Sequence, residues 1–337
     1  MEIYYSKTLR DKWNVCHTVV KDRIKSEISA DISCRGMEEK RMDIPVKNKK
    51  ESPIALLAEK YPQLLLPIRA GEKETEEYRA AVLSGAPLSA EPDFIGSPGD
   101  SLSVAETPAG KAEILYLKNR EDFEHAFRAL AHRCEPVEIP ASVGATTIRG
   151  LINWEKIHNH EKEYLQSGGT DWNLEFRRFT AEKANYLDSL ILLSSGDYSN
   201  VSAETAGLPT EEWKEKSVTI RKYHELTHFI CRALYPDDVD AVRDEVIADL
   251  IGLVAAFGSY DVHLAETFLG IEGETYREGG RLSYYTDPEH LNETVSLAGQ
   301  MIHQYAEAIS SENKSDPFRL IPILMEQQQY SQIKVAE

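Results

Sequence analysis

Two histidines, His224 and His228, stand four positions apart in this chain, and Glu225 follows the first of them. On a helix, residues four apart project from one face, so two imidazole nitrogens can bind the same Zn²⁺ ion. The neighbouring glutamate can then take a proton from a water at the metal's open position. A chain with 10 histidines and 56 acids among 337 residues is expected to contain about 0.05 such motifs by chance. The spacing therefore predicts a zinc site.

A third ligand is expected, because catalytic zinc sites use three protein ligands and a water. Glu245 and Asp249 stand four apart on one face of an otherwise apolar segment, where carboxylates are costly to bury unless they are paired or bind a metal. Glu245 completes a His₂Glu site if its helix packs antiparallel to the helix of the histidines. Asp249 can accept the second N–H of a ligand imidazole, and His224 is the candidate.

Two neighbouring helices are needed to position these side chains. Residues 217–235 contain no glycine or proline and are followed by Pro236, which predicts a helix that carries both histidines. Residues 238–257 repeat apolar side chains at helical spacing after a Pro-Asp-Asp turn. Either Asp237 or Asp238 is expected to cap this second helix.

The rest of the chain predicts strands first and helices afterwards. Helices are expected at 5–28, 51–65 and 120–134, a solvated loop at 35–50, strands at 112–117 and 187–193, an extended edge strand with bends at 137–154, and a mostly helical region from 211 to about 310. This order is typical of an α+β fold.

Composition and charge divide the chain into regions. Residues 1–83 carry 16 Lys+Arg and 14 Asp+Glu, whereas residues 84–337 carry 22 and 42. Residues 84–110 are rich in proline, glycine, serine and alanine and show no apolar period. We therefore expect a mainly helical region at 1–83, a linker or wrapping loop at 84–111 and a catalytic domain at 112–337. The opposite charge of the first region raises the hypothesis that it covers or regulates the cleft.

Taken together, the two motifs resemble those of a known family. H-E-x-x-H followed by E-x-x-x-D on the next helix is similar to the gluzincin metallopeptidases, the thermolysin-like branch of the zincins. Over residues 137–257, the resemblance implies a zincin-like domain in which a mixed sheet precedes the active-site helix and a mostly helical C-terminal part. It also implies that an edge strand, with 137–151 as the candidate, binds the substrate backbone. The site residues it implies are His224, His228 and Glu245 as zinc ligands, Glu225 as general base and Asp249 as the partner of a ligand histidine.

The resemblance is incomplete at the residue that stabilises the oxyanion. Gluzincins commonly use a downstream histidine or tyrosine, and no matching motif is present. Tyr284, Tyr285 and His290 lie in a glycine-rich stretch bounded by proline and are the candidates, while Arg281 could serve the same electrostatic role.

The implied function is zinc-dependent hydrolysis of peptide bonds in a peptide or protein substrate. A second resemblance, to the small H-E-x-x-H regulatory proteases that cleave repressors in the bacterial cytoplasm, implies the same chemistry. Two alternatives stay open. One is a zincin-fold binding or regulatory module with little or no catalysis. The other is a hydrolase of a non-peptide amide, which uses the same reaction at a carbonyl.

Overall composition excludes several classes of partner. The formal net charge of −18 excludes a protein that binds nucleic acid by bulk charge, and it disfavours a strongly anionic substrate. The apolar stretch 250–258 is shorter than the roughly 20 residues that cross a bilayer. The first 16 residues lack the apolar core of a secretory signal, and the four cysteines form no close pair. We therefore expect a cytoplasmic protein without nucleic-acid or membrane partners.

Overall fold

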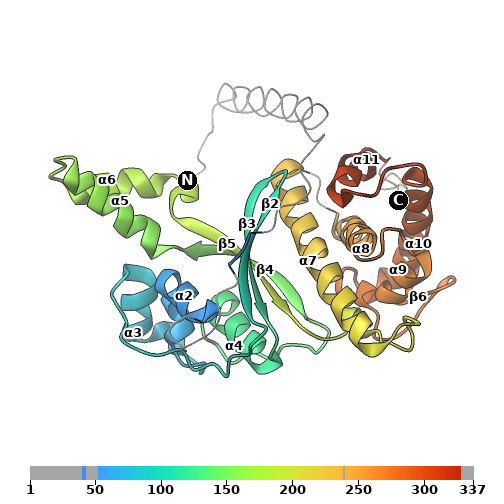
Figure 1. Ribbon diagram of the computed structural model, residues 1–337, viewed down its shortest axis with the longest axis horizontal. Coiled ribbons are helices and arrows are strands. Elements are labelled where there is room, and N and C mark those ends of the chain that lie inside the picture. Colours follow the sequence, from blue (N-terminus) through green and yellow to red (C-terminus); the bar gives the residue numbers. More distant parts are fainter. Residues whose placement is uncertain (1–39, 43–51, 238–239, 328–337) are drawn as a thin grey trace.

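A mixed sheet lies in the middle of the molecule (Figure 1). The computed structural model describes residues 40–42, 52–237 and 240–327. The strands are β1 (Lys40–Met42), β2 (Ser101–Thr107), β3 (Gly110–Leu117), β4 (Ala145–Ile152) and β5 (Leu187–Ser194), arranged in the order β1-β2-β3-β5-β4. The pair β3 and β5 is parallel and the other neighbours are antiparallel. Within the described residues, β4 is therefore an edge strand.

Helices cover both faces of this sheet, so the fold is α+β (Figure 1). One face packs against α2 (Pro53–Lys60), α3 (Glu76–Tyr78) and α4 (Arg120–Ala131). The remaining helices are α5 (Trp154–Gln166), α6 (Trp172–Ala181), α7 (Thr210–Leu234), α8 (Ala241–Phe257), α9 (Val262–Leu269), α10 (Leu291–Ala308) and α11 (Leu320–Glu326), with a small hairpin of β6 (Ile271–Glu272) and β7 (Thr275–Tyr276) after α9. Helices α7 to α11 gather on the other face, while α5 and α6 project to one side. None of the helices in the described part combines the length and apolar composition that a membrane span needs.

The central strands divide their side chains between two hydrophobic cores. On β3, Ile114 packs with the C-terminal helices, whereas Leu115 and Leu117 pack with α2 and α4. On β5, Ile191 packs with the C-terminal helices and Leu192 packs with α2 and α4. Because successive side chains of a strand point to opposite faces, a strand covered on both sides must be apolar almost throughout. This explains why β5 appears in the sequence as one continuous apolar run.

Residues 53–83 belong to the core shared with α4. Leu57 is fully buried there, and Lys60 Nζ donates a hydrogen bond of 2.8 Å to Glu113 Oε1 on β3. This segment packs on the sheet face away from α7. Residues 53–83 of the region that was expected to cover the cleft therefore lie on the opposite side of the sheet from the histidine-bearing helix.

Several predicted elements are confirmed, and two strand predictions are wrong. The strands at 112–117 and 187–193 and the helix after residue 120 are present as β3, β5 and α4. Residues 101–107, predicted as part of a loop or linker, form β2, a strand too short to stand out among glycines and prolines. The edge strand begins at Ala145 rather than at residue 137, since Pro136 and Pro140 lack the N–H that pairing requires.

The helix boundaries also differ from the predictions. Helix α7 begins at Thr210, directly after Pro209. Helix α8 is capped by Asp240, whose side chain accepts from two amides of the first turn, rather than by Asp237 or Asp238. The predicted helix at 5–28 lies outside the described residues, and β1 lies within the segment predicted as a solvated loop.

Candidate metal centre

Helices α7 and α8 approach closely enough for their side chains to form one site. At Gly252 of α8, a Cβ atom would lie 2.9 Å from the carbonyl oxygen of Ile220 on α7. Ile220 precedes His224 by one turn, and Gly252 follows Asp249 by nearly one turn. Earlier residues of α7 therefore face later residues of α8, which confirms the predicted antiparallel packing.

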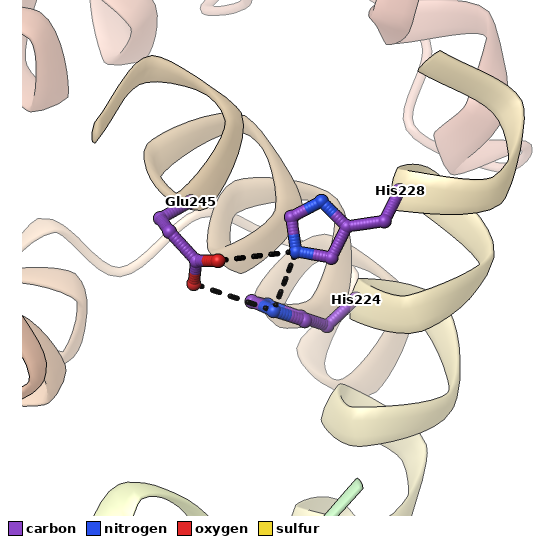
Figure 2. Close-up of side chains that lie close together, drawn as sticks. All are labelled: His224, His228 and Glu245. Carbon is purple, nitrogen blue, oxygen red and sulfur yellow. Dashed lines mark hydrogen bonds and ion pairs between the residues drawn. The ribbon is translucent and has the colours of Figure 1, made fainter. Parts of the chain in front are cut away.

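The side chains of His224, His228 and Glu245 converge between these helices (Figure 2). The two Nε2 atoms are 3.1 Å apart, His224 Nε2 lies 3.4 Å from Glu245 Oε2, and His228 Nε2 lies 3.2 Å from Glu245 Oε1. Ligand atoms about 2.1 Å from zinc in a tetrahedron are about 3.4 Å from one another. All three side chains are buried. The spacing and the donor types therefore fit a zinc ion.

Asp249 orients the first of these histidines. Its Oδ1 lies 2.9 Å from His224 Nδ1, on the side of the ring away from Glu245. Because an ionised carboxylate can only accept hydrogen bonds, this contact places the proton on Nδ1 and leaves a lone pair on Nε2. The predicted contact between Asp249 and His224 is confirmed, and it prepares Nε2 to act as a ligand atom.

Two further side chains, from segments far apart in the chain, complete the cluster. Tyr198 OH donates to Asp249 Oδ1 at 2.6 Å and lies 2.9 Å from His224 Nδ1. Arg281 donates to Asp249 Oδ2 and, at 3.2 Å, to Tyr198 OH, and its Nη1 lies 3.5 Å from Glu245 Oε2. Sequence reasoning considered Arg281 for the oxyanion only, and it did not identify Tyr198, one of 16 tyrosines with no local motif around it.

The backbone that aims Tyr198 into the cluster is strained. The two residues after it, Ser199 and Asn200, have left-handed φ values of 54° and 56°. Such conformations are uncommon for residues other than glycine and persist where the surrounding structure holds them. Here Ser199 Oγ donates a hydrogen bond of 2.9 Å to the carbonyl oxygen of Phe268, which ties the turn to α9.

The electrostatics of the cluster favour ionised carboxylates. Burial raises the pKa of Glu245, but His224, His228 and Arg281 outweigh it, so this pKa lies below its usual value. Burial also raises the pKa of Asp249, and Arg281 with His224 brings it below its usual value. Burial lowers the pKa of His228, while its contact with Glu245 raises it more strongly. A proton on His228 therefore stabilises the same carboxylate that a cation would.

Glu225 lies at the wall of a cavity of about 250 Å³ beside the three donors. Thr147 Oγ1, on the edge strand β4, donates a hydrogen bond of 2.7 Å to Glu225 Oε2. Residues 142–147 form one wall of this cavity, and α7 forms another. The glutamate thus faces the space between the histidine-bearing helix and the edge of the sheet.

Comparison with known proteins places the chain in a family. Residues 18–321 match a family described as "Family of unknown function (DUF7005)". The chain belongs to this family. Searches of curated proteins and of solved structures found no match. In this DUF7005 chain, the matched range includes every residue of the cluster, from Thr147 to Arg281.

Of the three downstream candidates for stabilising the oxyanion, the structure of this DUF7005 chain places two at the cavity and one away from it. Tyr284 and Tyr285 both line the cavity. Tyr285 is half-buried, and burial together with Glu245 raises its pKa above the usual value, although Arg281 opposes this. His290 is exposed at the start of α10, 3.7 Å from Glu293 on the same helix, and is not among the described residues that line the cavity. Its place at a helix N-terminus turns it towards solvent.

A larger cavity of about 1230 Å³ lies on the other face of the sheet, between α2, residues 85–100 and the start of α5. Its lining is mainly apolar and includes His158. Within the described ranges, the group of side chains suited to hold a metal is His224, His228 and Glu245, which lies elsewhere. The larger cavity of this DUF7005 protein is therefore separate from the group of side chains suited to hold a metal.

Proposed function

We propose that this protein is a zinc-dependent hydrolase of peptide bonds. The observation that carries the proposal is the convergence of two imidazoles and a carboxylate at tetrahedral spacing, with Glu225 beside them at a cavity. His224, His228 and Glu245 would hold the ion, and this donor set suits zinc. When bound, zinc supplies Lewis acidity, which polarises a carbonyl and makes a water more acidic.

Glu225 is the general base of the proposed reaction. It takes a proton from the attacking water and passes it to the leaving amine. Thr147 occupies Oε2 of this carboxylate, so Oε1 is available to accept the proton. Within the cluster, Arg281 is engaged by Asp249, which makes it a positioning residue for that carboxylate.

Tyr285 is the candidate donor to the oxyanion. Burial raises its pKa, so the hydroxyl keeps its proton at neutral pH and can donate a hydrogen bond. Tyr284 lines the same cavity but is 60% exposed, which leaves it less able to act in a site shielded from water.

The edge strand favours a peptide over another amide as substrate. Residues 142–147 line the cavity, and within the described residues the outer edge of β4 has no partner strand. An extended peptide can add to such an edge through main-chain hydrogen bonds. A mixed sheet whose edge strand lies beside the histidine-bearing helix supports a zincin-like fold, which we include in the proposal.

A cytoplasmic location is part of the proposal. Cys134 is a buried thiol outside any disulfide, which is the usual state of a cysteine in a reducing compartment.

The test combines metal analysis with peptide cleavage. Purified protein should hold about one zinc per chain. His224→Ala should lose this zinc, whereas Glu225→Gln should keep it and cleave a mixed peptide library about 10²- to 10⁴-fold more slowly. Glu215→Gln, an exposed change on the same helix, is the matched control and should behave like the wild type.

Two other outcomes would contradict the proposed peptidase function. Failure of the wild type to bind metal would contradict the enzyme hypothesis. Peptide binding without cleavage, equal in the wild type and in Glu225→Gln, would favour the binding module instead.

A further inference from the structure

Two arginines, Arg149 and Arg232, flank Glu225 between the edge strand and α7. Arg149 is two residues beyond Thr147 on β4, so both side chains leave the same face of the strand. Arg232 is one turn beyond His228 on α7 and lines the same cavity. Strand and helix therefore each place one guanidinium next to the proposed general base.

These two guanidinium groups differ from the other arginines at the cavity. Neither forms a hydrogen bond or ion pair with any residue of the ranges that the structure describes. The other two arginines of the cavity are engaged. Arg221 donates to the carbonyl oxygens of three residues, and Arg281 pairs with buried carboxylates. Of the three arginines that line the cavity, Arg221 and Arg281 therefore hold the structure together, whereas Arg232 does not, and neither does Arg149 on the adjoining strand.

The unpaired arginines also repel each other. Partial burial lowers the pKa of Arg149, Arg232 lowers it further, and only Glu225 acts in the opposite direction. Glu225 is one carboxylate beside two guanidinium groups, so positive charge remains in excess there, and an anion bound between the two arginines would relieve their repulsion.

We propose that Arg149 and Arg232 bind a carboxylate of the substrate, so that peptides with this group close to the cleaved bond are preferred. This inference rests on the proposed peptidase function. Guanidinium groups match carboxylates through paired N–H donors. The carboxylate belongs either to an acidic side chain or to the free C-terminus of a short peptide.

The placement limits how far the carboxylate lies from the reacting bond. Arg149 lies about 7 Å along the strand from Thr147, which holds Glu225. An extended peptide advances about 3.3 Å per residue, so the carboxylate lies within about two residues of the cleaved bond.

This preference differs from what the net charge of −18 led us to expect for the substrate. Charges on the surface are screened over about 8 Å at physiological ionic strength. The field at the cleft is therefore determined by the few groups beside it, and the acids elsewhere in the chain contribute little.

The test uses the zinc-loaded full chain and synthetic peptides that differ by Glu, Gln or Lys at each position, with free or amidated C-termini. We expect a preference of about 10- to 100-fold in kcat/KM, either for Glu over Gln at one position or for a free over an amidated C-terminus. Arg149→Gln and Arg232→Gln should each reduce this ratio, and the double change R149E/R232E should shift the preference towards Lys. The ratio should also fall as salt is added.

The arms of this experiment separate the sources of the carboxylate and the possible failures. A preference for Glu over Gln that survives amidation assigns the site to a side-chain carboxylate. A preference for free over amidated C-termini, with Glu and Gln peptides cleaved equally, assigns it to the C-terminal carboxylate. Arg177→Gln, an exposed change on α6, is the matched control and should leave the ratio unchanged. Equal cleavage of Glu and Gln peptides together with equal cleavage of free and amidated peptides, or a preference kept by R149E/R232E, overturns this inference and leaves the proposed function intact. No cleavage of any peptide by the wild type overturns both.

Discussion

Asp249 accepts hydrogen bonds from three side chains, which explains how a carboxylate that is only 1% exposed can remain ionised. Each donor comes from a different part of the fold: His224 from α7, Tyr198 from the turn after β5, and Arg281 from the segment after β7. An isolated buried charge would be strongly unfavourable, whereas one with several charged or hydroxyl donors is tolerated. Asp249 therefore joins three segments around the ring of one proposed ligand.

Tyr198→Phe should weaken zinc binding while the fold is kept. The change removes the hydroxyl that donates to Asp249 and retains the ring that packs against Phe268. Loss of a hydrogen bond to the partner of a metal ligand typically reduces metal affinity about 10- to 100-fold. Titration with a competing chelator measures this affinity.

Tyr260→Phe is the matched control for this change. The Tyr260 hydroxyl is buried without a hydrogen-bond partner among the described residues, so its removal should leave both zinc affinity and stability nearly unchanged. Equal zinc affinity in Tyr198→Phe and the wild type would show that the network does not position His224.

Some residues of this cluster could be predicted from the sequence, and others could not. His224, His228, Glu245 and Asp249 could be predicted because each pair has a fixed spacing within one helix. Tyr198 could not, since its contact with Asp249 joins positions 51 apart in the chain. A side chain brought in by tertiary packing leaves no periodic signal near itself.

The packing of α7 on α8 determines the distance between the ligands. Gly252 lies against the backbone of Ile220, one turn from His224, and therefore determines how closely the helices approach. No other residue type lacks a Cβ, so this contact requires glycine even though glycine weakens a helix interior.

Gly252→Ala should move the helices apart and disturb the site. Its new Cβ would lie 2.9 Å from a carbonyl oxygen, so the backbone must shift. We expect a loss of stability of about 1–3 kcal/mol, typical of overpacking, together with weaker zinc binding. Thermal unfolding monitored by circular dichroism, with and without zinc, measures both effects.

Gly299→Ala separates this packing effect from helix propensity. Gly299 lies in α10 and has no atom within 4 Å of an added Cβ. There the same change should stabilise the protein by about 0.5–1 kcal/mol. If Gly252→Ala also stabilised the protein, the proposed role of the close contact would be wrong.

Long helices could be predicted from the sequence more reliably than strands. The region 241–257 is apolar at regular helical spacing and has a clear start and stop, so α8 was recognisable. Strand β2 was not, because it has seven residues and gains its stability from pairing with β3 rather than from its own composition. For β4 the apolar and β-branched content was visible, but the point where pairing begins depends on the partner strand.

At the scale of the whole molecule, the sheet separates the proposed site from the large N-terminal core. The cluster lies on the face covered by α7 to α11, whereas residues 53–83 and α4 cover the other face. Both cores share the strands β3 and β5, whose alternate side chains enter each of them. The two sides should therefore unfold together, although only one contains the proposed site.

Leu57→Ala tests this coupling from the side away from the site. The side chain is fully buried in the core of α2, α4 and the sheet, so its truncation should lower the free energy of unfolding by about 2–5 kcal/mol. Leu83→Ala, at a side chain that is 55% exposed, should lower it by much less. Zinc affinity of the folded protein should stay unchanged in both, because neither residue contacts the cluster.

A single thermal transition of Leu57→Ala, at a lower temperature than that of the wild type, would fit one shared fold. Two thermal transitions, of which Leu57→Ala lowers only the temperature of the first, would instead support a separate segment that covers the cleft. Peptidase activity should then be higher once the first transition is complete.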